Sequence, residues 1–168
     1  MRFLLNCLSV VALLQLGSAA YAAEPLAPTK GPVLLTLSGS IEQTNAPGVA
    51  QFDREALEVL GRTSLVTTSA LSKTPQVYQG VSLQAVLGRV GAKGRTVKAS
   101  ALNAYEIEIP LEDLQYNPIL ATHVDGQALK VRDKGPLWIV YPRDAFKDLQ
   151  DVRYDSRWVW QLNRLHVE

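Results

Sequence analysis

Short runs of β-forming residues, each ended by turn residues, recur along the chain and restrict it to a strand-rich fold. The clearest run, Tyr105–Pro110, alternates strictly between polar and apolar residues until the proline ends it. Asp125-Gly126 predicts a tight hairpin turn between two further strands. Other predicted strands are residues 33–41, "SLVTTSA", "TVKASAL", "PILATHV" and "RWVWQLNRLHV".

Two or three short helices interrupt these strands. Asp53 can cap the free N–H groups of "REALEVL", and Ser82 is expected to cap "LQAVLGRV" in the same way. "LEDLQ" predicts a single helical turn, and the stretch with Pro75 and Gly80 predicts a loop. This order predicts a single α+β domain with a mixed sheet, strand-rich with a few short helices, and argues against a doubly wound parallel sheet.

The final predicted strand carries two tryptophans. Its alternation predicts one face formed by Trp158, Trp160, Leu162 and Arg164. The opposite face would then hold Val159, Gln161, Asn163 and Leu165.

The first residues predict export. A positive start at Arg2, an apolar stretch and the small-residue site Ala20-Tyr21-Ala22 are typical of a secretory signal peptide, residues 1–22. We therefore expect a periplasmic protein with a flexible lead-in at 23–32 and one domain at 33–168. The only cysteine, Cys7, would leave with the signal peptide.

Charge and hydropathy exclude some classes of partner. The chain has 17 Lys and Arg against 16 Asp and Glu, so loss of Arg2 with the signal peptide leaves 16 of each. A near-neutral chain without a basic run is a poor candidate for nucleic acid. No later apolar stretch is long enough to span a bilayer, so direct membrane insertion is not expected.

Signatures of catalysis are scarce. His123 and His166 lie far apart in strand-like segments, which favours structural or surface roles over a metal site. The glycines at 88, 91 and 94 follow a helix, so they lack the context of a phosphate-binding loop. The acidic residues Glu106, Glu108, Glu112 and Asp113 are spaced as a solvated face and a helix start.

Aromatic and cationic side chains gather near the C-terminus. The rings are Trp138, Tyr141, Trp158 and Trp160, and the neighbouring cations are Arg132, Lys134, Arg143 and Arg157. Asn103 and Tyr105 add an amide and a phenol. Rings stack on π systems and guanidinium groups pair with planar polar edges, so the cluster could form a pocket for a flat polar ligand. The rings could equally be core residues.

Four segments from Tyr78 onward carry a family resemblance. They are "YQGVSLQAVLGRVGAKG", "ALNAYEIEIPLEDL", "DGQALKVRDKGPLWIVYP" and "RWVWQLNRLHV". In this order they resemble the sulfite-oxidase-type molybdopterin-binding domain, and most closely its small exported branch of stand-alone pterin-binding proteins. The resemblance runs from about Val33 to the end of the chain.

One departure separates this chain from the enzymes of that fold. The resemblance places the metal-ligating cysteine of the enzymes in the stretch that here reads "SLVTTSALSKTPQVYQG", with Thr67 and Thr68 where a thiolate would be needed. Threonine does not replace a soft thiolate. The small branch also often has an acidic residue at the position of Ala104. If that carboxylate reads the amino edge of the pterin, another group must do so here, and Asp133 is one candidate.

The resemblance implies a pterin ligand without molybdenum. Trp138 or Trp158 would stack on the pterin, while Arg132, Lys134 and Asn103 would address its edge. Together with Thr67, Thr68, Tyr105 and Asp133, these residues make up the expected cofactor-binding site. The family also implies a partner, the periplasmic part of a membrane-bound cyclic-di-GMP enzyme.

Two alternatives stay open. The chain could be a molybdopterin-dependent oxidoreductase or a subunit of one, or a fold that serves only as a protein-interaction partner.

Overall fold

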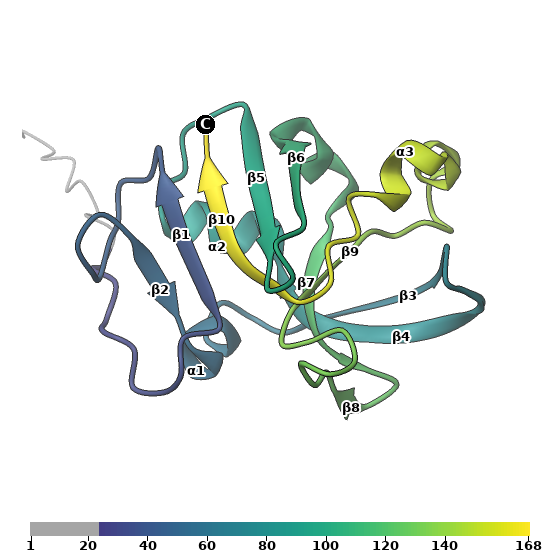
Figure 1. Ribbon diagram of the computed structural model, residues 1–168, viewed down its shortest axis with the longest axis horizontal. Helices are drawn as coiled ribbons and strands as arrows, with labels where there is room; N and C mark the ends of the chain where they lie inside the picture. Colours follow the sequence, from purple (N-terminus) through teal and green to yellow (C-terminus); the bar gives the residue numbers. More distant parts are fainter. Residues whose placement is uncertain (1–23) are drawn as a thin grey trace, which may run out of the picture.

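The computed structural model describes residues 24–168, so the predicted signal peptide lies outside the described residues. These residues form two β-sheets with short helices at their ends and between them (Figure 1). The strand-rich α+β fold predicted from the sequence is confirmed, although its strands divide between two sheets.

The first sheet has the strand order β2-β1-β10-β5-β6. β1 and β10 run parallel, whereas the other neighbours are antiparallel, so this sheet is mixed. Its strands are β1 (Leu35–Gly39), β2 (Ala50–Phe52), β5 (Thr96–Ala101), β6 (Glu106–Pro110) and β10 (Leu162–Val167).

The second sheet has the order β3-β4-β7-β8, and β9 also pairs with β7. Its strands are β3 (Thr63–Ser69), β4 (Ser72–Ser82), β7 (Ile119–Val124), β8 (Gln127–Ala128) and β9 (Trp138–Val140). The helices are α1 (Arg54–Glu58), α2 (Leu83–Arg89), the 3₁₀ turns η1 (Leu111–Tyr116) and η2 (Lys147–Gln150), and α3 (Val152–Asp155).

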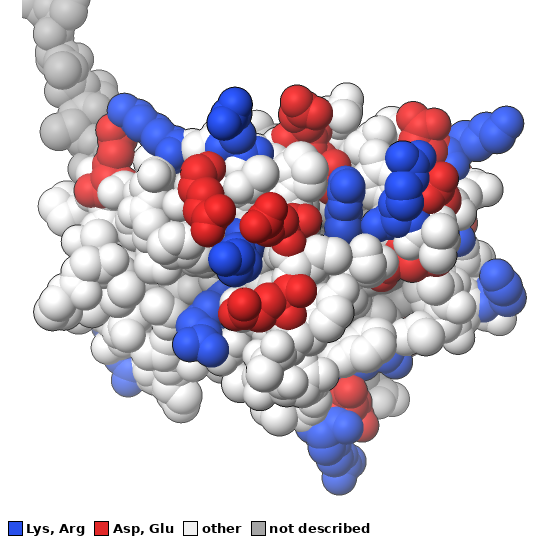
Figure 2. Space-filling model, turned by 45° about the horizontal axis from the view of Figure 1, so that its top comes forward, with Lys and Arg blue, Asp and Glu red and all other residues white. Residues whose placement is uncertain are grey.

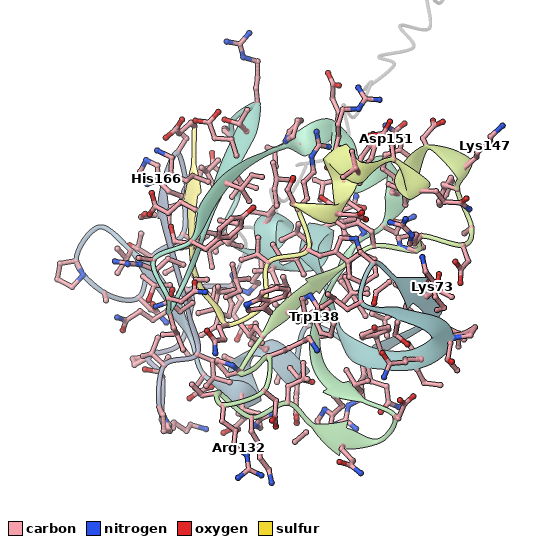
Figure 3. The ribbon with its side chains drawn as sticks, turned by 45° about the vertical axis from the view of Figure 1, so that its right-hand side comes forward. Lys73, Arg132, Trp138, Lys147, Asp151 and His166 are labelled. Carbon is pink, nitrogen blue, oxygen red and sulfur yellow. The ribbon has the colours of Figure 1, made fainter. Side chains whose placement is uncertain are left out.

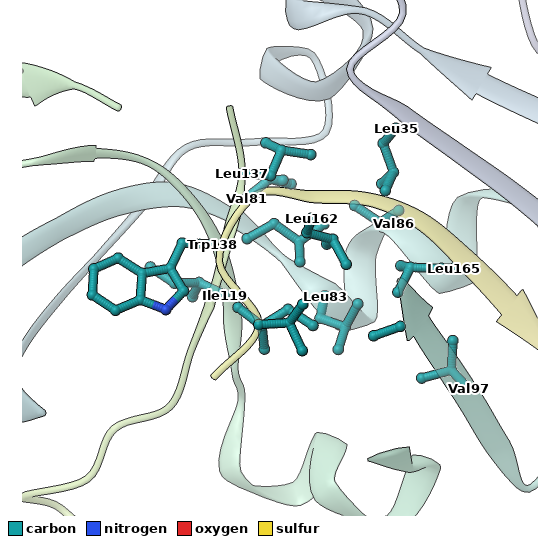
Figure 4. Close-up of a cluster of buried hydrophobic side chains, with 14 of the residues drawn as sticks. Leu35, Val81, Leu83, Val86, Val97, Ile119, Leu137, Trp138, Leu162 and Leu165 are labelled. Carbon is teal, nitrogen blue, oxygen red and sulfur yellow. The ribbon is translucent and has the colours of Figure 1, made fainter. Parts of the chain in front are cut away.

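The core lies where the two sheets and α2 meet. Leu35, Val86 and Leu165 come from β1, α2 and β10, and they converge with side chains of the second sheet (Figure 4). Trp138 lies at one end of this cluster, beyond Ile119 (Figure 4). Fully burying an aliphatic side chain contributes about 1.5–3 kcal/mol, so this cluster is the main source of stability.

The start of α1 follows the sequence prediction. Asp53 adopts an extended backbone, and its Oδ1 accepts a hydrogen bond from the N–H of Ala56 at 2.9 Å. Its Oδ2 accepts from the N–H groups of Lys30 at 2.7 Å and Gly31 at 2.8 Å. Asp53 therefore caps the helix and also ties the lead-in to the domain.

The lead-in makes further contacts of this kind. Arg89 donates to the carbonyl oxygens of Glu24 and Pro25, and Asn45 donates to that of Ala27. These hydrogen bonds join parts of residues 24–31 to the domain, and the flexible lead-in expected for residues 23–32 stays a prediction.

Two predictions around β4 are wrong. Pro75 and Gly80, expected in a loop, lie inside β4. Pro75 falls in the stretch where the pairing of β4 with β3 is irregular, so its lack of an N–H group breaks no hydrogen bond of the sheet. Gly80 has no side chain, and this lets β4 approach the backbone of β7 at Leu120. Ser82 precedes α2 as expected, but its side chain makes no capping hydrogen bond.

The alternation predicted for the last strand is also wrong. β10 begins only at Leu162, and its register with β5 shifts between Leu162 and Arg164. Leu162 and Leu165 are both buried despite their odd spacing, because one extra residue at such a bulge reverses the faces. Gln161, just before the strand, has a φ of 54° and so cannot be part of a regular strand.

Acidic and basic side chains are interspersed on the face shown in Figure 2, without a large area of one sign. Within residues 24–168 no helix has the length and hydropathy needed to cross a bilayer.

Candidate functional site

A hollow of about 210 Å³ opens beside Trp158, and we call it the Trp158 hollow. It is formed by the β5–β6 turn on one side and by the chain after α3 on the other. Its lining residues are Asn103, Tyr105, Asp155, Ser156, Trp158, Val159 and Trp160. Three aromatic rings and several polar groups therefore surround one small space.

The β5–β6 turn places Tyr105 at this hollow. Ala104 has a φ of 65°, and the Tyr105 N–H donates to the Asn103 Oδ1 at 3.1 Å. The Tyr105 hydroxyl then donates to the carbonyl oxygen of Ser156 at 2.9 Å. This bond joins the two sides of the hollow, so the phenol forms part of its wall.

The other wall is held by an ion pair on each side of Ser156. Arg143 pairs with Asp155, which lines the hollow, and Arg157 pairs with Asp113. The two pairs fix a segment that has no regular secondary structure beyond α3.

Asp113 is buried, so its predicted place on a solvated face is wrong. The Arg157 Nη1 lies 2.7 Å from Oδ1 and 2.6 Å from Oδ2 of Asp113, and the Tyr141 hydroxyl donates to Oδ2 at 2.8 Å. Burial, followed by the nearby Asp113 carboxylate, raises the pKa of Tyr141 well above its ordinary value. Tyr141 itself is fully buried.

A second hollow, of about 310 Å³, includes Trp138 in its lining and is called the Lys134 hollow. Asp133, Lys134 and Trp138 contribute to its lining, together with residues of β4, β7 and β8. The Lys134 Nζ lies 5.0 Å from the centre of the Trp138 ring. A ligand that stacks on this face of Trp138 would have to displace the ammonium group.

The two tryptophans meet between the hollows. Their ring centres are 5.9 Å apart at 67°, and Tyr78 packs edge-on against both. Within residues 24–168 neither buried indole N–H finds a hydrogen-bond acceptor. Buried polar groups without a partner are rare in folded proteins.

Thr67 and Thr68 line neither hollow. The Thr68 hydroxyl and N–H donate to the two carboxylate oxygens of Asp144 at 2.5 and 2.7 Å, and the Asp144 N–H donates to the Thr67 hydroxyl at 3.2 Å. The Thr68 hydroxyl is the main cause that lowers the pKa of Asp144. These threonines thus bind a neighbouring loop of the protein.

Arg132 points into solvent, away from Trp138 (Figure 3). Its nearest charged partner is Asp133, with 3.9 Å between Nε and Oδ1, and both side chains are largely exposed. The expected site residues therefore fall into four places: the Trp158 hollow, the Lys134 hollow, the Thr67–Thr68 contact and the exposed turn. Their role in binding stays a prediction.

Four lining residues were missed at the sequence level: Asp155, Ser156, Val159 and Trp160. Trp160 was noted in the aromatic cluster, but the strand pattern gave it no distinct role. Its exposure of 40% is unusual for a tryptophan and marks it as part of the hollow's mouth.

The comparison with protein families matches residues 51–148 to the oxidoreductase molybdopterin binding domain. This chain belongs to that family. No curated protein matches it.

Among solved structures, this family member is similar to the sulfane dehydrogenase SoxCD from Paracoccus pantotrophus. The two share 20% sequence identity with a TM-score of 0.60, over 80% of this chain and 38% of the other. At this identity the likeness shows a shared fold, and this chain spans well under half of the dehydrogenase chain.

The residues present fit a pterin better than a thiolate-ligated metal. Residues 24–168 contain no cysteine, because the sequence has only Cys7. The same residues hold no group of three or more His, Cys, Asp or Glu that could bind a metal ion. The Trp158 hollow offers aromatic rings, an amide and a carboxylate, which suit a flat ring with polar edges.

Proposed function

We propose that this chain is a non-catalytic, periplasmic pterin-binding protein, and that the Trp158 hollow holds the pterin ring. The observation that carries this proposal is a ring-sized hollow lined by Tyr105, Trp158 and Trp160 in a member of a molybdopterin-binding family. At about 210 Å³ it is smaller than the roughly 300–1,000 Å³ typical of ligand pockets. A bicyclic ring suits this volume better than a larger cofactor does.

The threonines support a binding role without catalysis. In the family resemblance, Thr67 and Thr68 stand where the enzymes have a metal-ligating thiolate, and here their hydroxyls hydrogen-bond the protein itself. Hydroxyl groups already committed in this way offer a soft metal no ligand.

Export and signalling complete the proposal. The signal-peptide pattern of residues 1–22 supports a periplasmic location. The resemblance to the small exported branch supports a partner, namely the periplasmic part of a membrane-bound cyclic-di-GMP enzyme, to which the protein would relay pterin status.

The test is a binding measurement on protein purified from the periplasm. We expect the released ligand to show pterin fluorescence, and added pterin to bind by calorimetry. Trp160→Ala should weaken binding about tenfold, because stacking on one aromatic ring contributes about 1–3 kcal/mol. Phe146→Ala is the matched control, since Phe146 is equally exposed at 39% but lies outside the hollow. Absence of any pterin binding would refute the proposal.

A molybdopterin-dependent oxidoreductase, or a subunit of one, is the second candidate because the family description itself names oxidoreductases. Metal analysis separates the two. Stoichiometric molybdenum in the purified protein would favour the enzyme.

A further inference from the structure

Asp155 is the only carboxylate among the residues that line the Trp158 hollow. It ends α3, and its side chain is 25% exposed, so it is partly shielded from water but still reachable from the hollow. Asp133, one candidate from the sequence, lines the other hollow. If an acidic group addresses a ligand beside Trp158, it is Asp155.

Arg143 fixes the position of this carboxylate. Its guanidinium pairs with the Asp155 Oδ1 and also donates to the carbonyl oxygens of Leu149 at 3.3 Å and Gln150 at 3.2 Å. Three contacts to one planar group leave Arg143 little freedom. Within residues 24–168 no side chain or N–H group donates to the second oxygen of Asp155, so that oxygen remains available to a ligand.

Two other polar groups of the hollow are already committed. The Asn103 Oδ1 accepts from the N–H of Tyr105, and the Tyr105 hydroxyl donates to the carbonyl oxygen of Ser156. The remaining strong acceptor is the Asp155 carboxylate. A hydrogen bond to a charged group is roughly twice as strong as one between two neutral groups.

Such an acceptor distinguishes between ring edges. A ring edge that presents an amino group beside a ring N–H offers two parallel donors to a carboxylate. An edge with a carbonyl in place of the amino group presents an acceptor instead, which the carboxylate repels.

We propose that Asp155 makes the Trp158 hollow selective for rings that carry an amino group beside a ring N–H. The ion pair with Arg143 holds the Asp155 carboxylate in the position that this recognition needs. This inference rests on the proposed pterin-binding function and specifies which ring edge the site reads. Asp155 is thus a specificity-determining residue, and Arg143 is a positioning residue.

The experiment compares two fluorescent probes that differ at this edge: pterin, which has the amino group, and lumazine, which has a carbonyl there. Dissociation constants are measured for the wild type, Asp155→Asn and Arg143→Met. We expect the wild type to prefer pterin by about tenfold or more. Asp155→Asn should bring this preference below about threefold, since an amide replaces one acceptor oxygen by a donor.

Arg143→Met separates edge recognition from structural support. It removes the ion pair but keeps the Asp155 carboxylate, so we expect the preference for pterin to fall only in part, to a value between those of the wild type and Asp155→Asn. Asp148→Asn, an exposed carboxylate in η2 outside the hollow, is the control for the loss of one negative charge. Circular dichroism and urea midpoints establish that each variant is folded.

The outcomes are distinguishable. If Asp155→Asn leaves the ratio of the two constants unchanged, Asp155 does not read the edge and the inference is wrong. If Arg143→Met leaves the ratio at the wild-type value, Arg143 does not position the carboxylate and that part of the inference fails. Wild-type protein that binds neither probe would overturn the proposed function and this inference together.

Discussion

Replacing Asp113 by Asn should destabilise the domain strongly, although Asp113 lies outside both hollows. The carboxylate links η1 to Tyr141, which follows β9, and to Arg157, which follows α3. An amide of the same shape removes the charge and places an N–H₂ donor against either the Tyr141 hydroxyl or the Arg157 guanidinium. The guanidinium then keeps its charge with no counter-ion.

The expected loss follows from burial. Removing one partner of a fully buried ion pair costs about 3–5 kcal/mol. The side chain of Asp113 is 6% exposed and that of Arg157 is 21% exposed, so water can reach the guanidinium and the lower end, about 3 kcal/mol, applies. For a domain of this size that loss lowers the melting temperature by about 6–12 °C.

Urea denaturation followed by tryptophan fluorescence measures this loss, with an expected fall in the midpoint of about 1–2 M. Glu55→Gln is the matched control, because Glu55 pairs with Lys30 where both side chains are more than 60% exposed, at 66% and 78%. Exposed pairs contribute little, so its midpoint should not move measurably. If Asp113→Asn loses no more stability than Glu55→Gln, the buried pair does not hold this wall and the reasoning fails.

Further predictions concern backbone and pH. In urea denaturation, Gly88→Ala in α2 should stabilise the domain by about 0.5–1 kcal/mol, because alanine favours a helix more than glycine does. The added methyl group has space, since no atom beyond the neighbouring helix backbone lies within 4 Å of it. Gly80→Ala should destabilise it by about 3 kcal/mol, because the methyl would lie 1.9 Å from a carbonyl oxygen of β7. Equal effects of the two changes would contradict this account. Ala104→Asn should stabilise the domain by about 1 kcal/mol, since asparagine tolerates a φ of 65° better than alanine does, and an unchanged melting temperature would argue against strain there. The backbone N–H groups of Ala56 and then Gly31 lower the pKa of Asp53 in the folded state. The charged carboxylate therefore stabilises the fold above the unfolded pKa of about 3.9. This stabilisation is lost as the pH falls through the lower, folded pKa. Urea midpoints of Asp53→Asn from pH 6 to pH 2 should therefore fall less steeply than those of the wild type, and parallel curves would refute this.

Local signals in the sequence predicted local structure well. The alternation of Tyr105–Pro110 gave β6, and Asp53 caps α1 as expected. Asp125-Gly126 forms the hairpin turn with φ values of 49° and 77°. Each of these features depends on residues within a few positions of one another, so a pattern in the sequence can encode it.

Long-range pairing explains what the sequence could not predict. Asp113 has the spacing of an exposed residue at a helix start. Its burial is favourable only because Tyr141 and Arg157, 28 and 44 positions later in the chain, form hydrogen bonds with its carboxylate. Pro75 and Gly80 are turn residues by local preference, yet the pairing of β4 with strands on both sides overrides that preference. The same limit applies to the site, because no local pattern brings Asp155 next to Asn103.

The segment before β10 shows how a failed pattern creates the site. An uninterrupted strand from Trp158 would have put both tryptophans on one face. Instead, the N–H of Gln161 donates to the Lys134 carbonyl at 2.8 Å, and the N–H of Ile139 donates to the Val159 carbonyl at 2.9 Å. These bonds draw residues 158–161 alongside the start of β9, and the positive φ of Gln161 then turns the chain back into the first sheet. Trp158 is thereby buried against Trp138 while Trp160 stays exposed at the hollow. The departure from regular pairing thus gives the two rings different environments: Trp158 is packed in the core, and Trp160 is accessible at the hollow proposed to hold the ligand.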